Sequence, residues 1–520
     1  MPAKLKKHLP ILIVLLISLI IGIFTFQDYG MTWDENFYYQ YGEAVGYAYS
    51  IPAHLSSDFD INRAYGPSIG DHKVYGPVYL LITRIPVLVL RSITGLDIFS
   101  LWHLFNFITF LIGVYYLYRL ALRWLKPNVA FWTALLYLSQ PLLWGHAFIN
   151  PKDPPFATLF IITIHYGFKM VDHFSAKNIT LKKIGRNQLW LVILVGILIG
   201  IATNLRIIAP FIAVLIFIYA LLQRKWKVIL WFIPIGIIAI IVLYITWPYL
   251  WDAPVENFLG VLARMSNNPT KLKVLFYGKE YRAYELPLRY LPVLLGITLT
   301  EPVWILFTLG FGSVAFKLWK KELDEWKSLS VIFFWFIFIT GYILALRPPM
   351  YDGFRHFFFI LPPVFILAGF GIEQISAWGK KPWLNSLVML SLLFYGVRGI
   401  IALHPYEYAY YNQFIGGVSG AEGTYETEYW LTCYKESVEE LTTFVNGAET
   451  LLQVYREPNN AAYYAPENIE VIDAIHVAPG DYLLLSARLN EVNMIHRKSS
   501  NIIEVGRDGA TFCAIREIEP

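Results

Sequence analysis

Two neighbouring acidic residues, Asp34 and Glu35, lie just beyond the first long apolar segment, in the stretch GMTWDENFYY. A carboxylate in such a place can accept the proton of an incoming hydroxyl group during group transfer. The same pair also suits the start of a helix at Trp33: Thr32 followed by Glu35 fits a capping box, and acids in a first turn favour the helix dipole. The stretch by itself is compatible with both interpretations.

Charged residues also stand in three other short segments between apolar runs. INPKDPP holds Lys152 and Asp153, YDGFRHFFF holds Arg355 and His356, and ATNLRIIAP holds Arg206. The turn around Arg206 is nearly loop-free, and a charge so close to membrane depth is expensive and usually has a partner. Taken singly, the other charges are explained as solvated turn residues or as side chains that snorkel from a helix end.

Together these segments place acids and cations in one layer, at the ends of several apolar runs. This combination suits the transfer of a group from a lipid phosphate. A carboxylate can deprotonate the acceptor, while arginine and lysine side chains hold the phosphate leaving group and stabilise its growing charge. The lipid tail would lie in a groove between the apolar helices.

The composition is that of a polytopic membrane protein. Hydrophobic residues make up 56% of the 520 residues and charged residues only 15%, whereas soluble domains carry about 25% charge. The apolar residues gather in long runs, and roughly 20 such residues span a bilayer as a helix. The net charge of +4 is small, and the positive residues cluster in short loops. This pattern indicates membrane topology rather than binding of nucleic acid.

Eleven of the apolar runs are expected to cross the membrane. A twelfth, 78–92, carries Arg84 near its centre, and a charge at mid-bilayer costs at least ~2.5 kcal/mol. If 78–92 lies along the membrane surface, every short basic loop falls on the same side as the lysine-rich N-terminus, as the positive-inside rule prefers. That side is the cytoplasm. The expected spans are 9–26, 101–118, 129–148, 156–171, 189–204, 207–222, 228–247, 298–316, 329–346, 357–376 and 383–402.

This topology predicts two domains. Residues 1–402 form the membrane domain, with a catalytic outer loop over 27–100 and a second outer loop over 248–297. Residues 403–520 form a soluble extracytoplasmic domain. Its segments TLLQVY, IEVI, DYLLLS and TFCAIREI alternate or cluster apolar residues as strands do, and KESVEELTTFV has the pattern of a helix. The tail is therefore expected to be a small α/β domain.

Four segments together resemble the C-type (GT-C) membrane glycosyltransferases. They are TWDENFYYQYG, HKVYGPVYLLI, GHAFINPKDPPFATLF and LRIIAP. The likeness is to the protein O-mannosyltransferase-like family (glycosyltransferase family 39), which includes the aminoarabinose transferases of lipid A, and an acid pair after the first span is its hallmark. The family commonly has a Lys- or His-Pro-Pro element where this chain reads HKVYGP, so His72 and Lys73 receive no role.

The resemblance implies an all-α GT-C membrane domain and an inverting transfer of a sugar from a polyprenyl-phosphate donor. In this scheme Asp34 is the general base toward the acceptor, and Glu35 orients Asp34 or the sugar. Asp153 binds the acceptor, or a metal if there is one. The residues expected to contact the donor phosphate are Arg206, Arg355, His356 and Lys152.

The sequence leaves several alternatives open. A carboxylate pair suits Mg²⁺ or Mn²⁺ as well as metal-free base catalysis, and the acceptor is a protein, a lipid or a glycan. Cys433 and Cys513 either pair in an oxidising compartment or remain buried free thiols. The alternative function is a polytopic transporter or lipid flippase. Transporters, however, place ionisable groups near the membrane midplane and often contain repeats, whereas most charges here gather at the outer face.

Overall fold

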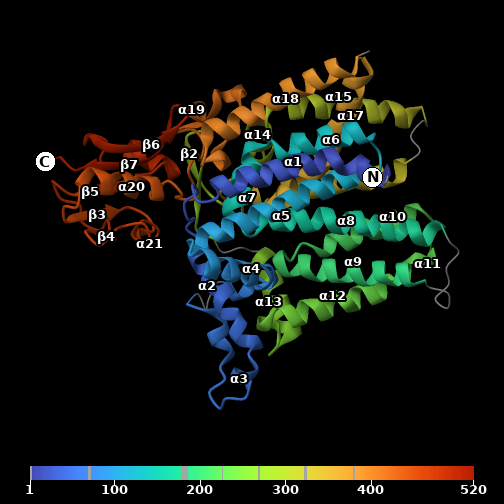
Figure 1. The fold of residues 1–520 in the computed structure, drawn as a ribbon, viewed down its shortest axis with the longest axis horizontal. Coiled ribbons are helices and arrows are strands. Elements are labelled where there is room, and N and C mark those ends of the chain that lie inside the picture. The colour runs from blue at the N-terminus through green and yellow to red at the C-terminus, as the bar shows by residue number, and fades with distance from the viewer. Residues whose placement is uncertain are drawn as a thin grey trace.

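The computed structural model describes residues 3–67, 72–176, 185–224, 226–266, 270–320, 325–378 and 381–519. These residues form a bundle of long helices with a small sheet domain beyond one end, and the N-terminus lies at the opposite end (Figure 1). The bundle helices are α1 (Ala3–Thr25), α5 (Ile98–Ala121), α6 (Pro127–Leu138), α7 (Pro141–Ile149), α8 (Asp153–Ala176), α9 (Arg186–Leu205), α10 (Pro210–Leu222), α11 (Trp226–Ile229), α12 (Phe232–Thr246), α15 (Glu301–Trp319), α16 (Trp326–Leu346), α17 (Leu361–Trp378) and α18 (Pro382–Leu403).

All eleven apolar runs predicted to span the membrane are helical. In the described part of the chain, eight helical segments are long and apolar enough to cross a bilayer. The other three runs correspond to the pair α6 and α7, to α8, and to the shorter α10. The run over 129–148 is divided into two helices at Pro141, because proline lacks an amide hydrogen and its ring clashes with the carbonyl of the preceding turn.

The bundle is held together by close helix packing, most clearly between α15 and α17. A Cβ atom added to Gly310 would lie only 1.8 Å from the carbonyl oxygen of Leu367, and one added to Gly371 only 2.1 Å from that of Leu306. Only glycine permits this backbone approach, as in other membrane helix pairs built on small residues. The packing fixes where α17 begins, and therefore where the residues just before it lie.

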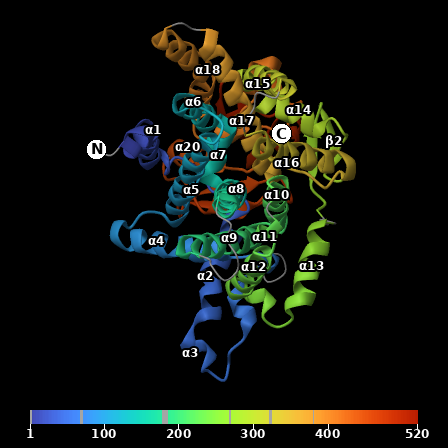
Figure 2. The same cartoon turned by 90° about the vertical axis from the view of Figure 1, so that its right-hand side faces the viewer.

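Two long segments, between α1 and α5 and between α12 and α15, connect bundle helices at the sheet end and contain elements of their own. Helix α4 contains the run predicted to lie along the membrane surface, and Figure 2 shows it lying across the bundle axis, as does α13. Helix α2 follows α1 and carries the first acidic stretch. The elements of these segments are α2 (Glu35–Ala44), α3 (Ile51–His54), α4 (Val78–Thr94), α13 (Pro254–Ser266), β1 (Lys273–Phe276), β2 (Lys279–Arg282) and α14 (Tyr290–Thr298).

The C-terminal domain is built on a five-stranded mixed sheet in the order β4-β3-β5-β7-β6. Strand β3 pairs in parallel with β4 and β5, while β7 pairs antiparallel with β5 and β6. The four predicted strands and the predicted helix are present, and the sequence analysis missed the strand β6 and three short helices. The elements are β3 (Thr450–Val454), β4 (Ile469–Asp473), β5 (Tyr482–Ser486), β6 (Asn501–Arg507), β7 (Ala510–Glu517), α19 (Gly417–Ala421), α20 (Tyr434–Val445), α21 (Pro458–Ala462) and α22 (Glu491–Met494).

The two cysteines form a disulfide in this domain. Cys433, directly before α20, is bonded to Cys513 of β7, 80 positions further along the chain. Both are fully buried. The bond ties the helix to the sheet. Of the two alternatives that the sequence left open, paired cysteines or free thiols, the structure has the pair.

Candidate active site

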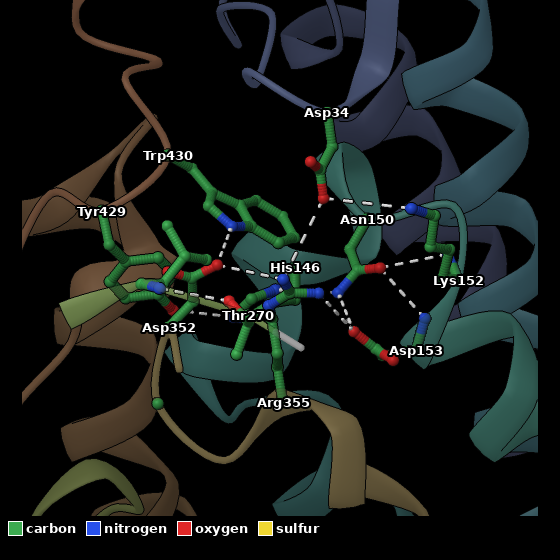
Figure 3. A network of polar contacts seen from close by, with 12 residues as sticks. Asp34, His146, Asn150, Lys152, Asp153, Thr270, Asp352, Arg355, Tyr429 and Trp430 are labelled. Carbon is green, nitrogen blue, oxygen red and sulfur yellow. Dashed lines mark hydrogen bonds and ion pairs between the residues drawn. The ribbon is translucent and has the colours of Figure 1, made fainter. Parts of the chain in front are cut away.

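Asp34 lies where α1, α7, α8 and the segment before α17 come together. Its Oδ2 atom is 3.9 Å from Nζ of Lys152 and 4.0 Å from Nη2 of Arg355, and its side chain is 42% exposed (Figure 3). Asp34 is the N-cap residue of α2 but makes no capping hydrogen bond with its side chain. The carboxylate is therefore left partly exposed beside two cations, and we call the space around Asp34, Lys152 and Arg355 the recess.

Glu35 has a different environment from its neighbour. It is fully buried, and its carboxylate accepts hydrogen bonds from the hydroxyl of Tyr39 (2.8 Å) and from the amide of Thr32 (2.8 Å). Nε2 of His103 lies 3.0 Å from it. The bond from Thr32 is one half of the predicted capping box, although α2 begins at Glu35, two residues later than expected. Glu35 thus fixes the start of the helix, and its buried carboxylate is bonded to residues of the protein interior.

A chain of charge pairs lies beneath Asp34. Nη1 of Arg355 is 3.1 Å from Asp153, and its Nη2 is 3.0 Å from Asp352. Asp153 also pairs with Arg206 and accepts a hydrogen bond of 2.9 Å from Asn150. Asp153 is 2% exposed and is engaged by both cations. The sequence analysis had expected it to bind the acceptor or a metal.

Two residues of the tail complete this network. Nη1 of Arg488 lies 3.0 Å from Oδ1 of Asp352, and Nε1 of Trp430 donates to Oδ2 of Asp352 at 3.0 Å. The guanidinium of Arg488 also stacks 4.3 Å from the ring of Trp33, next to Asp34. The sequence analysis did not find Arg488 or Trp430, because they lie far from the acid pair in the chain. The sequence signal near their common partner, Asp352, was an Asp-Gly pair, which indicates a turn. In the structure Asp352 has a φ of 54°.

Charge compensation sets the protonation states in the recess. Burial raises the pKa of Asp34, but attraction from Lys152, Arg355 and His72 outweighs burial and holds this pKa below its ordinary value. Burial lowers the pKa of Lys152, and Asp34 opposes that effect. The Lys152 ammonium lies 4.4 Å from the centre of the Tyr38 ring and 4.8 Å from that of Tyr75. Asp34 is consequently an ionised carboxylate near neutral pH.

An apolar groove opens beside this recess. It has a volume of about 240 Å³, and its walls come from α9, α13, α16 and the segments next to them. Tyr75, Arg206 and His356 line it together with apolar side chains such as Ile207 and Trp247. Nε of Arg206 and Nδ1 of His356 are buried without a hydrogen-bond partner. The groove therefore combines apolar walls suited to a lipid tail with two buried nitrogens that lack a hydrogen-bond partner, close to Asp34 and Lys152.

The carboxylates do not form a set of metal ligands. Arg355 lies between Asp34, Asp153 and Asp352, so that each carboxylate faces a guanidinium. Within the described ranges, no group of three or more His, Cys, Asp or Glu side chains is arranged to hold a metal ion. The residues present do not fit a Mg²⁺ or Mn²⁺ site, and the chemistry considered below uses side chains alone.

The chain has the GT-C fold, which the sequence resemblance predicted. The chain is similar to the crystal structure of ArnT from Cupriavidus metallidurans bound to undecaprenyl phosphate, at 12% identity and a TM-score of 0.51, over 97% of both chains. Two structures of the Archaeoglobus fulgidus oligosaccharyltransferase are less similar, with TM-scores of 0.47. The apo form is 12% identical over 90% of this chain, and AglB in complex with an inhibitory peptide and a dolichol-phosphate is 13% identical over 92%; each match spans 62% of the larger protein. No family model and no curated protein matches the sequence.

Proposed function

We propose that this protein is an integral-membrane glycosyltransferase that moves a sugar from a polyprenyl-phosphate donor to an acceptor hydroxyl, with inversion. The observation that carries the proposal is the half-exposed carboxylate of Asp34, about 4 Å from Lys152 and Arg355, beside an apolar groove. A general base, cations for a phosphate and a place for a lipid tail are the three parts that this reaction needs.

In the proposed reaction Asp34 takes the proton of the acceptor hydroxyl. The acceptor oxygen then bonds to C1 of the sugar as the bond from C1 to the phosphate oxygen breaks. The bonding electrons pass to the phosphate, and polyprenyl phosphate leaves. One displacement from the opposite face inverts the configuration at C1.

Lys152 is our main candidate for the phosphate contact, because its ammonium has no acid within hydrogen-bonding distance in the described structure. Arg206 and His356 are the other candidates, since each has a nitrogen without a partner and lines the groove. Arg355 has both terminal nitrogens engaged by carboxylates. We therefore assign it to positioning and to the local field rather than to direct binding.

The lipid tail of the donor is proposed to lie in the groove of Tyr75, Arg206 and His356. The similar ArnT structure was solved with undecaprenyl phosphate bound, which supports a polyprenyl-phosphate donor for this chain. The sugar would then project toward Asp34, and the acceptor would approach from the side of the C-terminal domain.

We also propose that the N-terminus is cytoplasmic and that the reaction takes place on the other side of the membrane. The positive-inside pattern supports this orientation. The N-terminus and the C-terminal domain lie at opposite ends of the bundle (Figure 1). The disulfide between Cys433 and Cys513 supports it independently, because disulfides persist in oxidising compartments.

The test is to incubate the purified protein with a panel of polyprenyl-phosphate sugars and to measure released polyprenyl phosphate by mass spectrometry. Asp34→Asn should abolish release, whereas Asp28→Asn, an exposed acid of the same loop paired with His404, should not. A transporter or flippase would move the donor lipid across a bilayer without releasing polyprenyl phosphate. Release at equal rates from wild type and Asp34→Asn would remove Asp34 as the base.

A further inference from the structure

A second cavity lies at the end of the bundle that is farthest from Asp34. It has a volume of about 520 Å³ and is formed where α1 begins and where α5 and α8 end. Helix α8 starts beside the candidate active site at Asp153, and Lys169 of this cavity follows 16 residues later, roughly 24 Å along the helix. The cavity is therefore separate from the site described above.

Positive charge dominates this cavity. Its lining includes Lys7, Arg119, Arg123 and Lys169 but only one acid, Asp172. Asp172 is already engaged, because it pairs with Arg123 at 2.7 Å and accepts a hydrogen bond from a tyrosine of α10. The other three cations form no ion pair with any described residue.

The contacts of those three cations leave room for an anion. Nη1 of Arg119 donates a hydrogen bond to the uncharged hydroxyl of Tyr115, at 3.2 Å. The Lys169 ammonium lies near an uncharged ring, 5.7 Å from the centre of Tyr166. Lys7 is exposed at the start of α1. Like charges that converge from three helices repel one another unless something negative lies between them.

Two histidines lie among these cations. Nδ1 of His8 and Nε2 of His165 are buried and have no hydrogen-bond partner, and both residues line the cavity. Buried polar nitrogens without a partner are rare in folded proteins and call for a ligand or water that bonds them. Phe168 supplies an apolar side to the same cavity.

We propose that this cavity binds the phosphate group of an anionic lipid headgroup. Basic pockets between helix ends on the cytoplasmic side of membranes bind such headgroups. The positive-inside rule alone explains basic residues at these helix ends, but it requires neither a cavity nor unpartnered histidines. The proposal does not depend on the glycosyltransferase activity, and a free phosphate would present the same chemistry.

The experiment uses the full chain in nanodiscs of phosphatidylcholine. Phosphatidylglycerol is added as the lipid probe and inorganic phosphate as the soluble one, and binding is followed by native mass spectrometry and by the shift of the unfolding temperature. The double variant Arg119→Gln/Lys169→Gln should bind about thirtyfold more weakly, because each cation near an anionic lipid contributes about a fivefold effect.

Two further variants make the result decisive. Lys126→Gln/Lys227→Gln removes two exposed lysines at the same end of the bundle, outside the cavity, and should bind as wild type does. Arg119→Lys/Lys169→Arg keeps the charge and should retain binding, which excludes misfolding as the cause of a loss. Binding that is weakened only in the first variant supports the site, and the probe that binds identifies its source. Equal binding by all variants, or no saturable binding of either probe, would overturn the proposal.

Discussion

Two ion pairs with the same shortest N···O distance, 3.0 Å, connect the helix bundle to the C-terminal domain, and they allow a comparative test of the site. Arg488 lies 3.0 Å from Asp352, with side chains that are 1% and 0% exposed. Arg398 of α18 lies 3.0 Å from Asp508, between β6 and β7, with side chains that are 46% and 29% exposed. The exposed pair makes two hydrogen bonds and the buried pair only one, so a larger coupling energy for the buried pair can be attributed to burial.

The expected magnitudes follow from this difference. Exposed ion pairs contribute about 0.2–1 kcal/mol. Removing one partner of a buried pair costs about 3–5 kcal/mol, because it leaves an uncompensated charge. Without Arg488, Asp352 would still pair with Arg355 and accept the hydrogen bond of Trp430, each at 3.0 Å. We therefore expect a coupling energy of about 2–3 kcal/mol for the buried pair, somewhat below that full cost.

The assay is a pair of double-mutant cycles on the purified protein. Arg488→Leu and Asp352→Asn form one cycle, Arg398→Leu and Asp508→Asn form the other, and the free energy of unfolding is measured in mixed micelles. A coupling energy for the buried pair no larger than that for the exposed pair would refute the reasoning.

The same cycle has a catalytic readout. Asp352 holds Nη2 of Arg355, the atom that lies 4.0 Å from Asp34. Arg488→Leu should therefore lower kcat for sugar transfer, while KM for the donor changes little, because Arg488 does not contact the phosphate candidates in the described structure. A loss confined to stability, with kcat unchanged in the folded fraction, would make Arg488 structural only.

Three other predictions concern single sites. Asp34→Asn should lower turnover about 10²–10⁴-fold and leave the unfolding temperature unchanged, because the side chain is 42% exposed; a parallel loss of stability would count against the base. Lys152→Gln should lower kcat/KM about 10–100-fold, the value of a hydrogen bond to a charged group, as measured by polyprenyl phosphate release. Burial raises the pKa of Glu426 to about 8, so the folded state keeps a proton between about pH 4.5 and 8 that the unfolded state releases, and stability falls as pH rises through this window. Glu426→Gln should thus unfold at the same temperature as wild type near pH 4 and at a higher one near pH 9, and a pH-independent difference would contradict the assignment.

Much of the fold could be predicted from the local pattern of the chain. A run of about 20 apolar residues must form a helix in a membrane, because only a helix satisfies its backbone groups within the segment. Run length and loop charge therefore located the long helices, and alternating apolar residues located the strands of the tail. The breaks within runs were less visible, and Pro141 divided one predicted span into two helices.

The candidate site was only partly predictable. Asp34, Lys152 and Arg355 were chosen because charges at the ends of apolar runs collect at one membrane face, and both cations do lie within about 4 Å of Asp34. Glu35 and Asp153 are also acids at the ends of apolar runs, but their side chains are buried. Residue type and spacing do not distinguish a carboxylate that faces a recess from one that faces the protein interior.

The sequence by itself determined which segments are helices, which ends of them carry charge, and that an acid pair follows the first span. Only the tertiary structure decided which charges meet. Arg488 is 136 residues from Asp352 in the chain, and their contact depends on how the C-terminal domain docks and on how far α17 is drawn toward α15 by its glycines. Helix rotation and domain docking are set by the packing of whole apolar faces, so they cannot be predicted from the local spacing of residues.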